Sequence, residues 1–167
     1  MIDLAAARVI LIGGVSGSGK SHYASRLAAE LPGHALVRLD WMYNSLVATG
    51  ARHPRRKMAK LAPAIVAEII GGGEPAIIDG GWIEPRAWAR LAAGRIDCRA
   101  RFLGYPTTEP KALLARLAAT DHWLGAPDAA TQGFLRRQIA HSAEQQRRIA
   151  GSMVADFIDV SGGFGAR

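Results

Sequence analysis

Apolar residues along the chain follow two patterns: short uninterrupted runs, and longer stretches in which they recur every three or four positions. The first short run, residues 9–12, is rich in β-branched side chains and stops at two glycines, which is typical of a strand buried on both faces. Runs of this kind predict five strands, at residues 9–12, 35–39, 75–79, 98–103 and 154–160. The periodic stretches predict helices at residues 20–31, 56–70, 85–93, 109–119 and 134–150. Residues 121–133, rich in Gly, Pro and Asp, are predicted to form a loop, and residues 41–53 give no clear pattern.

Strands and helices alternate through the chain. This order predicts an α/β protein of three layers (α/β/α), in which helices cover both faces of a five-stranded parallel sheet. We find no internal repeat and no linker, so residues 1–167 are expected to form a single domain. Ligands of such folds bind beyond the carboxyl ends of the strands. Gly14, Asp40, Asp79 and Tyr105 each follow a predicted strand, and we expect them to meet at one rim of the sheet.

The segment after the first strand matches the phosphate-loop pattern G-x-x-x-x-G-K-[ST]. Its residues are Gly14, Val15, Ser16, Gly17, Ser18, Gly19, Lys20 and Ser21. Glycines let successive backbone N–H groups point at an anion, and the helix that follows directs its positive end at the same group. The lysine of this pattern reaches the β- and γ-phosphates of ATP, and the hydroxyl binds Mg²⁺. A plain glycine-rich turn could match by chance, but the position between a buried strand and a helix is the context that the motif requires. The sequence therefore predicts an ATP and Mg²⁺ site here.

Two aspartates that follow strands are candidates for metal binding and catalysis. Asp79 ends the third predicted strand, where a carboxylate can hold Mg²⁺ from the second side, directly or through water. The alternative for this residue is a turn-forming role before Gly80. Asp40 follows the second strand and is a candidate to orient an attacking hydroxyl and accept its proton. The alternatives for Asp40 are a helix N-cap or, if the acceptor is a phosphate, a residue that only positions the substrate.

The charge of the chain points to an anionic ligand or to a basic solvated surface. There are 21 basic and 14 acidic residues, for a net charge of +7, and most of the basic residues are arginines. Arginine binds phosphate and carboxylate oxygens in a bidentate manner. Between the second and third strands, the candidates to bind an anionic acceptor are Arg52, Arg55, Arg56 and Lys57, and of these we select Arg55. No recognition motif for nucleic acid accompanies the positive charge, so the expected partner is a small molecule.

The number of cysteines and the length of the apolar runs indicate in which cellular compartment the protein is expected. The single cysteine, Cys98, excludes an internal disulfide and suits a reducing cytosol. No apolar run is long enough to span a bilayer, and residues 1–8 lack the apolar core of a signal peptide. We therefore expect a cytoplasmic protein without a membrane partner, as a monomer or homodimer.

These residues resemble those of the P-loop group of small-molecule and nucleoside-monophosphate kinases, which includes adenylate, shikimate and gluconate kinases. Residues 14–21 are especially similar to the loop of gluconate kinases, and Asp40 matches the acidic position after strand two in shikimate and gluconate kinases. Residues 77–86, IIDGGWIEPR, are similar to the Asp-Gly-aromatic-Pro-Arg stretch of adenylate kinases and to a stretch of adenylate-kinase-like topology modulators. The resemblance covers the chain in outline, and only the phosphate loop is diagnostic of it.

The resemblance implies further parts of the fold and of the site. It implies a P-loop NTPase fold of the nucleoside-monophosphate kinase type, with an acceptor-binding insert at about residues 41–73 and a mobile lid at about residues 111–137. Lid arginines of the family close over the transferred phosphate, and the candidates here are Arg116, Arg136 and Arg137. The resemblance also implies that Arg86 binds an anionic group of the acceptor.

Two departures from the family leave the substrate unnamed. Met42 stands where shikimate kinases carry a second aspartate, and inserted residues break the spacing of the adenylate kinase stretch. The leading hypothesis is an ATP-dependent kinase of a small molecule, whose catalytic candidates are Lys20, Asp40, Arg116 and Arg136. The alternative hypothesis is a nucleotide-dependent regulatory ATPase or switch that acts through a protein partner.

Overall fold

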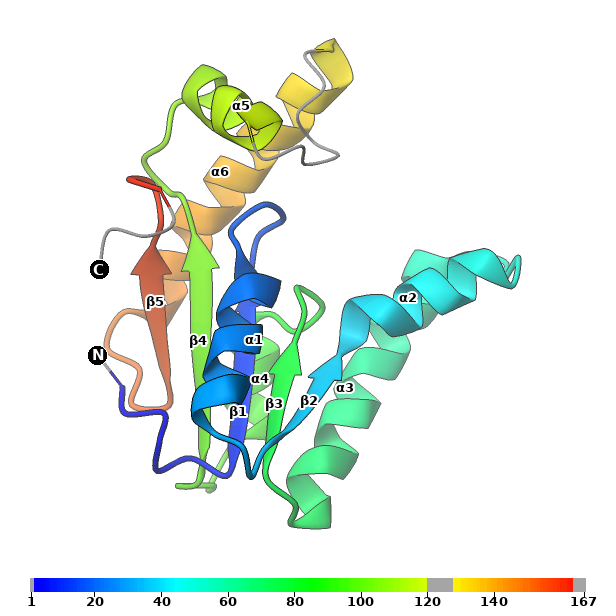
Figure 1. The fold of residues 1–167 in the computed structure, drawn as a ribbon, viewed down its shortest axis with the longest axis vertical. Coiled ribbons are helices and arrows are strands. Elements are labelled where there is room, and N and C mark those ends of the chain that lie inside the picture. The colour runs from blue at the N-terminus through cyan, green and yellow to red at the C-terminus, as the bar shows by residue number, and fades with distance from the viewer. Residues whose placement is uncertain (1, 120–127, 164–167) are drawn as a thin grey trace.

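The computed structural model of the chain describes residues 2–119 and 128–163 (Figure 1). Its elements are, in chain order, β1 Val9–Gly14, α1 Lys20–Glu30, β2 Ala35–Arg38, α2 Leu39–Ala48, α3 Pro54–Gly72, β3 Ala76–Asp79, α4 Pro85–Leu91, β4 Cys98–Gly104, α5 Pro110–Ala119, α6 Ala129–Ile149 and β5 Ala155–Asp159. The strands form one sheet in the order β2-β3-β1-β4-β5, and every neighbouring pair is parallel. The predicted five-stranded parallel sheet is confirmed.

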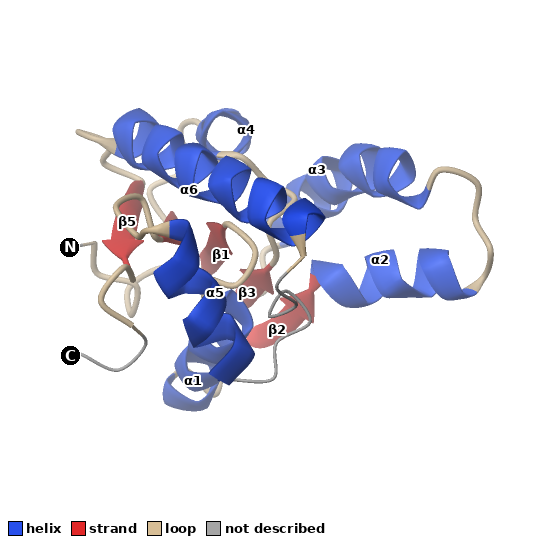
Figure 2. Cartoon of the chain, turned by 90° about the horizontal axis from the view of Figure 1, so that it is seen from above, coloured by secondary structure: helices blue, strands red, loops and turns tan. Residues whose placement is uncertain are grey.

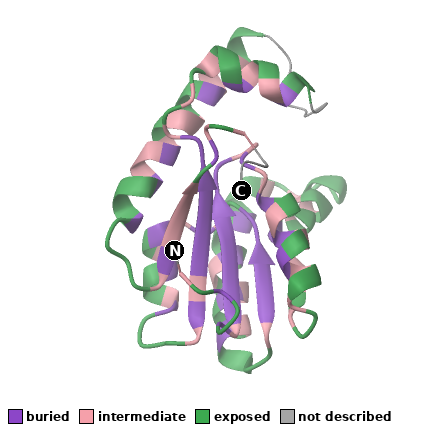
Figure 3. Cartoon of the chain, turned by 60° about the vertical axis from the view of Figure 1, so that its left-hand side comes forward, coloured by how far each residue is buried: buried purple, intermediate pink, exposed green. Residues whose placement is uncertain are grey.

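Helices cover both faces of this sheet, as the alternation of elements predicts. One apolar cluster joins the strands to α3, α4 and α6 through side chains such as Met58, Trp88 and Ile149. A second cluster on the other face joins them to α1 and α5 through Leu27 and Leu113. Seen from above, α3, α4 and α6 lie on one side of the strands and α1 on the other (Figure 2). The central strands β1 and β3 are buried along their whole length, which explains their uninterrupted apolar sequences (Figure 3).

The segment without a clear sequence pattern contains a helix, α2. It begins directly after β2, so Asp40 lies in the first turn of a helix and not at the end of a strand. Trp41, Met42 and Val47 of this helix are exposed, which obscures the amphipathic pattern. The two helices α2 and α3 contact each other, and α2 with the adjoining start of α3 projects away from the sheet, whereas the rest of α3 packs on it (Figure 1). They occupy the region of the predicted acceptor-binding insert.

Two other helices differ from the sequence prediction. Helix α6 begins at Ala129, so residues 129–133 are helical and not part of a loop. The Asp128 carboxylate caps this helix by accepting a 2.6 Å hydrogen bond from the backbone N–H of Thr131. Helix α3 is longer than predicted and continues through Pro63. Residues 120–127, which include part of the predicted loop and lid, lie outside the described residues. Within residues 2–119 and 128–163, no helix has both the length and the apolar character needed to cross a bilayer.

Candidate functional site

The loop between β1 and α1 has the conformation that its glycines permit. Gly14 has a φ of 120°, and a Cβ atom there would lie 2.0 Å from the carbonyl oxygen of Leu103 on the adjacent strand β4. Gly17 and Gly19 also have positive φ values, of 74° and 80°. Gly19 precedes α1 without a side-chain cap, so the first N–H groups of this helix are left for a ligand. The geometry is that of an anion-binding loop followed by a helix N-terminus.

Lys20 places a buried ammonium group at the centre of the loop. Its Nζ donates a 2.7 Å hydrogen bond to the carbonyl of Val15, and the residue is 8% exposed. Burial lowers the pKa of Lys20, whereas the carboxylates of Asp40 and Asp79 act in the opposite direction. The lysine therefore lies within electrostatic reach of both aspartates, which come from different elements.

Asp79 at the end of β3 provides a buried carboxylate with unused hydrogen-bonding capacity. The residue is 2% exposed, and its Oδ1 has no hydrogen-bond partner among the described residues. Burial raises the pKa of Asp79, and the nearby Ser21 hydroxyl and Lys20 ammonium oppose that shift. A buried carboxylate oxygen without a hydrogen-bond partner destabilises the folded protein, unless a bound ligand or ion supplies the missing interaction.

The pair of Asp79 and Ser21 fits a magnesium ion. No group of three or more His, Cys, Asp or Glu side chains that could hold a metal occurs in the described part of the chain. Mg²⁺ usually takes only one or two protein ligands and completes its octahedron with phosphate oxygens and water. The carboxylate of Asp79 and the hydroxyl of Ser21 are therefore enough protein ligands for Mg²⁺ beside a phosphate loop. Metal binding by these two residues stays a prediction.

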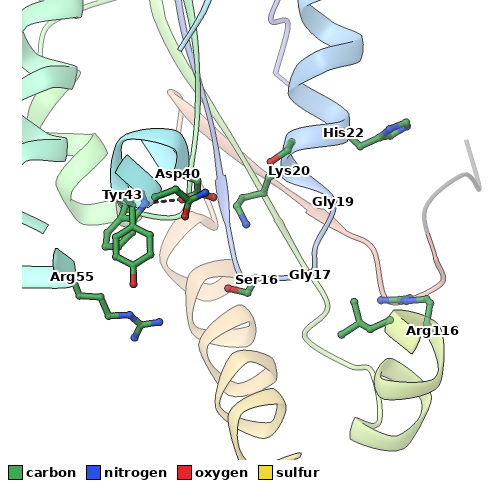
Figure 4. Close-up of a pocket in the computed structure, with 13 residues that line it drawn as sticks. Ser16, Gly17, Gly19, Lys20, His22, Asp40, Tyr43, Arg55 and Arg116 are labelled. Carbon is green, nitrogen blue, oxygen red and sulfur yellow. Dashed lines mark hydrogen bonds between the residues drawn. The ribbon is translucent and has the colours of Figure 1, made fainter. Parts of the chain in front are cut away.

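Asp40 lies in a cavity next to the loop and is oriented by an aromatic side chain. Its Oδ1 accepts a 2.7 Å hydrogen bond from Nε1 of Trp82, which follows β3. The rings of Trp82 and Tyr43 are in contact, with centroids 5.0 Å apart. Together with Arg55 these residues line a cavity of about 890 Å³ that also includes the phosphate loop. Figure 4 shows Asp40, Tyr43 and Arg55 on one side of Lys20 and Arg116 on the other.

The predicted arginines separate into two sets. Arg55 and Arg116 line the large cavity. Arg116 also donates 3.0 Å hydrogen bonds to the carbonyls of Val160 and Ser161, which follow β5. The other candidates are not among the described residues that line this cavity or a smaller one beside the phosphate loop, and all are exposed: Arg52, Arg56, Lys57, Arg86, Arg136 and Arg137. Arg86 lies on α4 near Glu144 of α6. The catalytic and acceptor-binding roles proposed for Arg86 and Arg136 stay predictions without support from the cavity.

Helix α6 supplies site residues that the sequence analysis missed. The side-chain oxygen of Gln138 accepts a 3.1 Å hydrogen bond from the backbone N–H of Ser16 in the phosphate loop. Gln138 and His141 line a smaller cavity of about 260 Å³ that includes Lys20 and Asp40. On the other side of the loop, the Tyr105 hydroxyl donates to the carbonyl of Ser16. No local motif indicates the α6 residues, because their place depends on how this helix packs across the ends of the strands.

Comparison with known proteins agrees with the observed fold. A family model described as an AAA domain matches residues 9–144. No match was found among curated protein sequences. The fold is similar to a gluconokinase from Sinorhizobium meliloti 1021, with a TM-score of 0.61 and 20% identity over 96% of this chain and 85% of that chain. It is also similar to a shikimate kinase from Acinetobacter baumannii in complex with shikimate, with a TM-score of 0.60 and 15% identity over 93% and 85% of the two chains. At such identities the likeness concerns the fold alone.

Proposed function

The chain belongs to the AAA domain family and has the fold of P-loop small-molecule kinases, and from this premise we propose that it transfers the γ-phosphoryl group of ATP to a hydroxyl or phosphate group of a small molecule. One observation carries the proposal. Lys20, Asp79 and Asp40 come from three separate segments, and the buried ammonium group of Lys20 lies within electrostatic reach of both carboxylates. A protein that only bound a nucleotide would need the lysine and the metal-side carboxylate, but not a second carboxylate in a cavity that extends beyond the phosphate loop to Tyr43 and Arg55.

Each group has a defined task in the proposed reaction. The phosphate loop binds the polyphosphate of ATP, and Lys20 neutralises charge on the β- and γ-phosphates. Ser21 and Asp79 would hold Mg²⁺, which would supply further positive charge to the polyphosphate. Arg55 suits an anionic group of the acceptor, since it lines the cavity near Asp40.

Asp40 acts on the acceptor when this is an alcohol. The acceptor oxygen forms a bond to the γ-phosphorus, the bond from that phosphorus to the β–γ bridging oxygen breaks, and ADP leaves. The hydroxyl proton passes to the Asp40 carboxylate, which Trp82 holds in one orientation. When the acceptor is a phosphate, no proton has to be removed, and Asp40 only positions the substrate.

The test is formation of ADP in the presence of individual metabolites. Purified protein with MgATP is incubated with sugar acids, other hydroxy acids, polyols and nucleoside monophosphates, and mass spectrometry checks for a phosphorylated product. We expect one compound class to raise ADP formation many-fold and to gain one phosphoryl group. ADP formation that no compound stimulates would contradict the kinase proposal and favour a nucleotide-dependent ATPase or switch.

A further inference from the structure

The smaller cavity has a wall that none of the predicted site residues accounts for. Its volume is about 260 Å³, and its lining includes Lys20, Asp40 and Arg55 together with Gln138 and His141. The last two side chains lie three residues apart on α6 and therefore on the same face of that helix. In Figure 4 the α6 ribbon passes beside Ser16, where Gln138 holds the loop amide. Helix α6 thus contributes a wall to the space next to the phosphate loop.

His141 is held in this wall by a carboxylate from another segment. Its Nε2 lies 3.1 Å from Oε1 of Glu84, the residue that precedes α4. The side-chain amide of Gln145 lies 3.3 Å from the other oxygen of the same carboxylate, and so helps to fix it. The same amide nitrogen of Gln145 also lies 3.2 Å from Nε2, so Nε2 of His141 is in contact with both Glu84 and Gln145. The contact leaves Nδ1 as the ring nitrogen for a ligand.

The charge of this pair indicates what kind of group it binds. The carboxylate of Glu84 places a negative charge beside His141 at this wall. This wall therefore does not attract an anion, whereas Arg55 on another part of the cavity lining does. A ligand hydroxyl can donate to Nδ1 or accept from it, so it suits His141 in either tautomer and better than a phosphate or a carboxylate does.

We propose that His141, positioned by Glu84, binds a second hydroxyl group of the phosphoryl acceptor and so helps to determine which acceptor is used. This inference rests on the proposed kinase function. In this arrangement three contacts orient the bound acceptor: its reacting hydroxyl faces Asp40, an anionic group faces Arg55, and a further hydroxyl faces His141. His141 touches the substrate in this arrangement, whereas Glu84 is a positioning residue.

The test compares binding of a small panel to the MgADP-loaded protein by calorimetry. The panel contains D-gluconate, shikimate and nucleoside monophosphates, and the compound that binds best is used with the variants. We expect His141→Ala to weaken its binding about tenfold, the effect of one hydrogen bond. His141→Asn, whose amide can donate or accept a hydrogen bond in place of Nδ1, should retain most of the affinity. The matched control is Gln146→Ala, an exposed position on the same helix, which should bind like the unchanged protein.

A double-substitution cycle separates positioning from general damage. Glu84→Ala should cause a loss similar to that of His141→Ala, and the two changes together should cause little further loss. Affinity for MgADP should stay the same in all these variants. Unchanged acceptor binding in His141→Ala, or a parallel loss of MgADP affinity, would overturn this inference and leave the kinase proposal intact. A panel that neither binds nor accepts phosphate would instead contradict the kinase proposal, and this inference would fall with it.

Discussion

Trp82 and Asp40, which are far apart in the sequence, are joined by a hydrogen bond of 2.7 Å from the indole N–H to the carboxylate. The bond connects the turn after β3 to the first turn of α2. Asp40 is exposed, so without a partner its side chain could adopt several rotamers. Trp82 therefore restricts the carboxylate to one orientation beside the phosphate loop. This restriction matters because proton transfer and hydroxyl positioning both depend on geometry.

Replacing Trp82 with Phe should impair turnover without affecting nucleotide binding. The ring can still pack on Tyr43, but the donor to Asp40 is lost. We expect kcat to fall about five- to tenfold, because Asp40 becomes less well oriented. Steady-state kinetics with the acceptor found in the metabolite screen measure the effect. Trp41→Phe is the control, since Trp41 is 66% exposed and does not line the cavities; an equal loss in both variants would argue against the orienting role.

Asp40→Asn distinguishes a base from a residue that only positions the substrate. The amide keeps the shape and can still accept from Trp82, but it cannot take up a proton. If the acceptor is an alcohol, kcat should fall by about 10²-fold or more, with little change in the affinity for MgATP. If the product analysis identifies a phosphate acceptor, the loss should be small and confined to KM. A large loss with a phosphate acceptor would contradict this assignment.

Lys20→Met should abolish phosphoryl transfer. The methionine side chain has a similar length but carries no charge to stabilise the β- and γ-phosphates, and losses of about 10²- to 10³-fold follow the removal of one such group. Turnover and MgATP affinity are measured beside the circular dichroism spectrum, which should be unchanged. Lys60→Ala, an exposed lysine of α3, is the control and should retain full activity. Normal turnover in Lys20→Met would refute the assignment of the site.

The sequence was sufficient for the parts of the protein that depend on local pattern. The apolar run of β1 and the glycines after it define a buried strand and an anion-binding loop within a few residues, and both occur in the structure. Helix α2 was missed because Trp41 and Val47 are exposed on it. Its apolar residues are therefore not confined to one buried face, which obscures the helical pattern in the sequence. The hydrogen bond between Gln138 and the Ser16 amide joins residues 122 positions apart. Such contacts depend on helix packing, which no local motif records.

Gly14→Ala should destabilise the protein even though the change adds a single methyl group. The new Cβ would lie 2.0 Å from a backbone oxygen of β4, at a φ of 120° that side chains rarely adopt. Strain of this kind costs about 1–3 kcal/mol, and about 1 kcal/mol shifts Tm by about 2–4 °C in a chain of this size. With the steric clash added, we expect Tm to fall by about 5 °C or more. Gly33→Ala is the control, because nothing lies within 4 Å of a Cβ there; equal Tm values for the two variants would contradict the close approach of β1 to β4 at this position.

The thiol of Cys98 should be unreactive in the native protein. The residue is fully buried in β4, and burial raises the pKa of the thiol from 9.0 to about 11. At pH 8 only about one native thiol in a thousand is ionised, compared with about a tenth of the thiols in the unfolded chain. A disulfide reagent such as DTNB should therefore react slowly in buffer and rapidly after denaturant is added.

The same shift predicts how stability depends on alkaline pH. Because the folded pKa lies above the unfolded value, the stabilisation is complete below pH 9 and is lost as pH rises toward about 11. The difference in Tm between the unchanged protein and Cys98→Ala, in which no thiol titrates, should accordingly shrink over this range. Rapid stoichiometric labelling of the native protein at pH 8 would show that Cys98 is accessible. That result would contradict the buried position of this residue in β4.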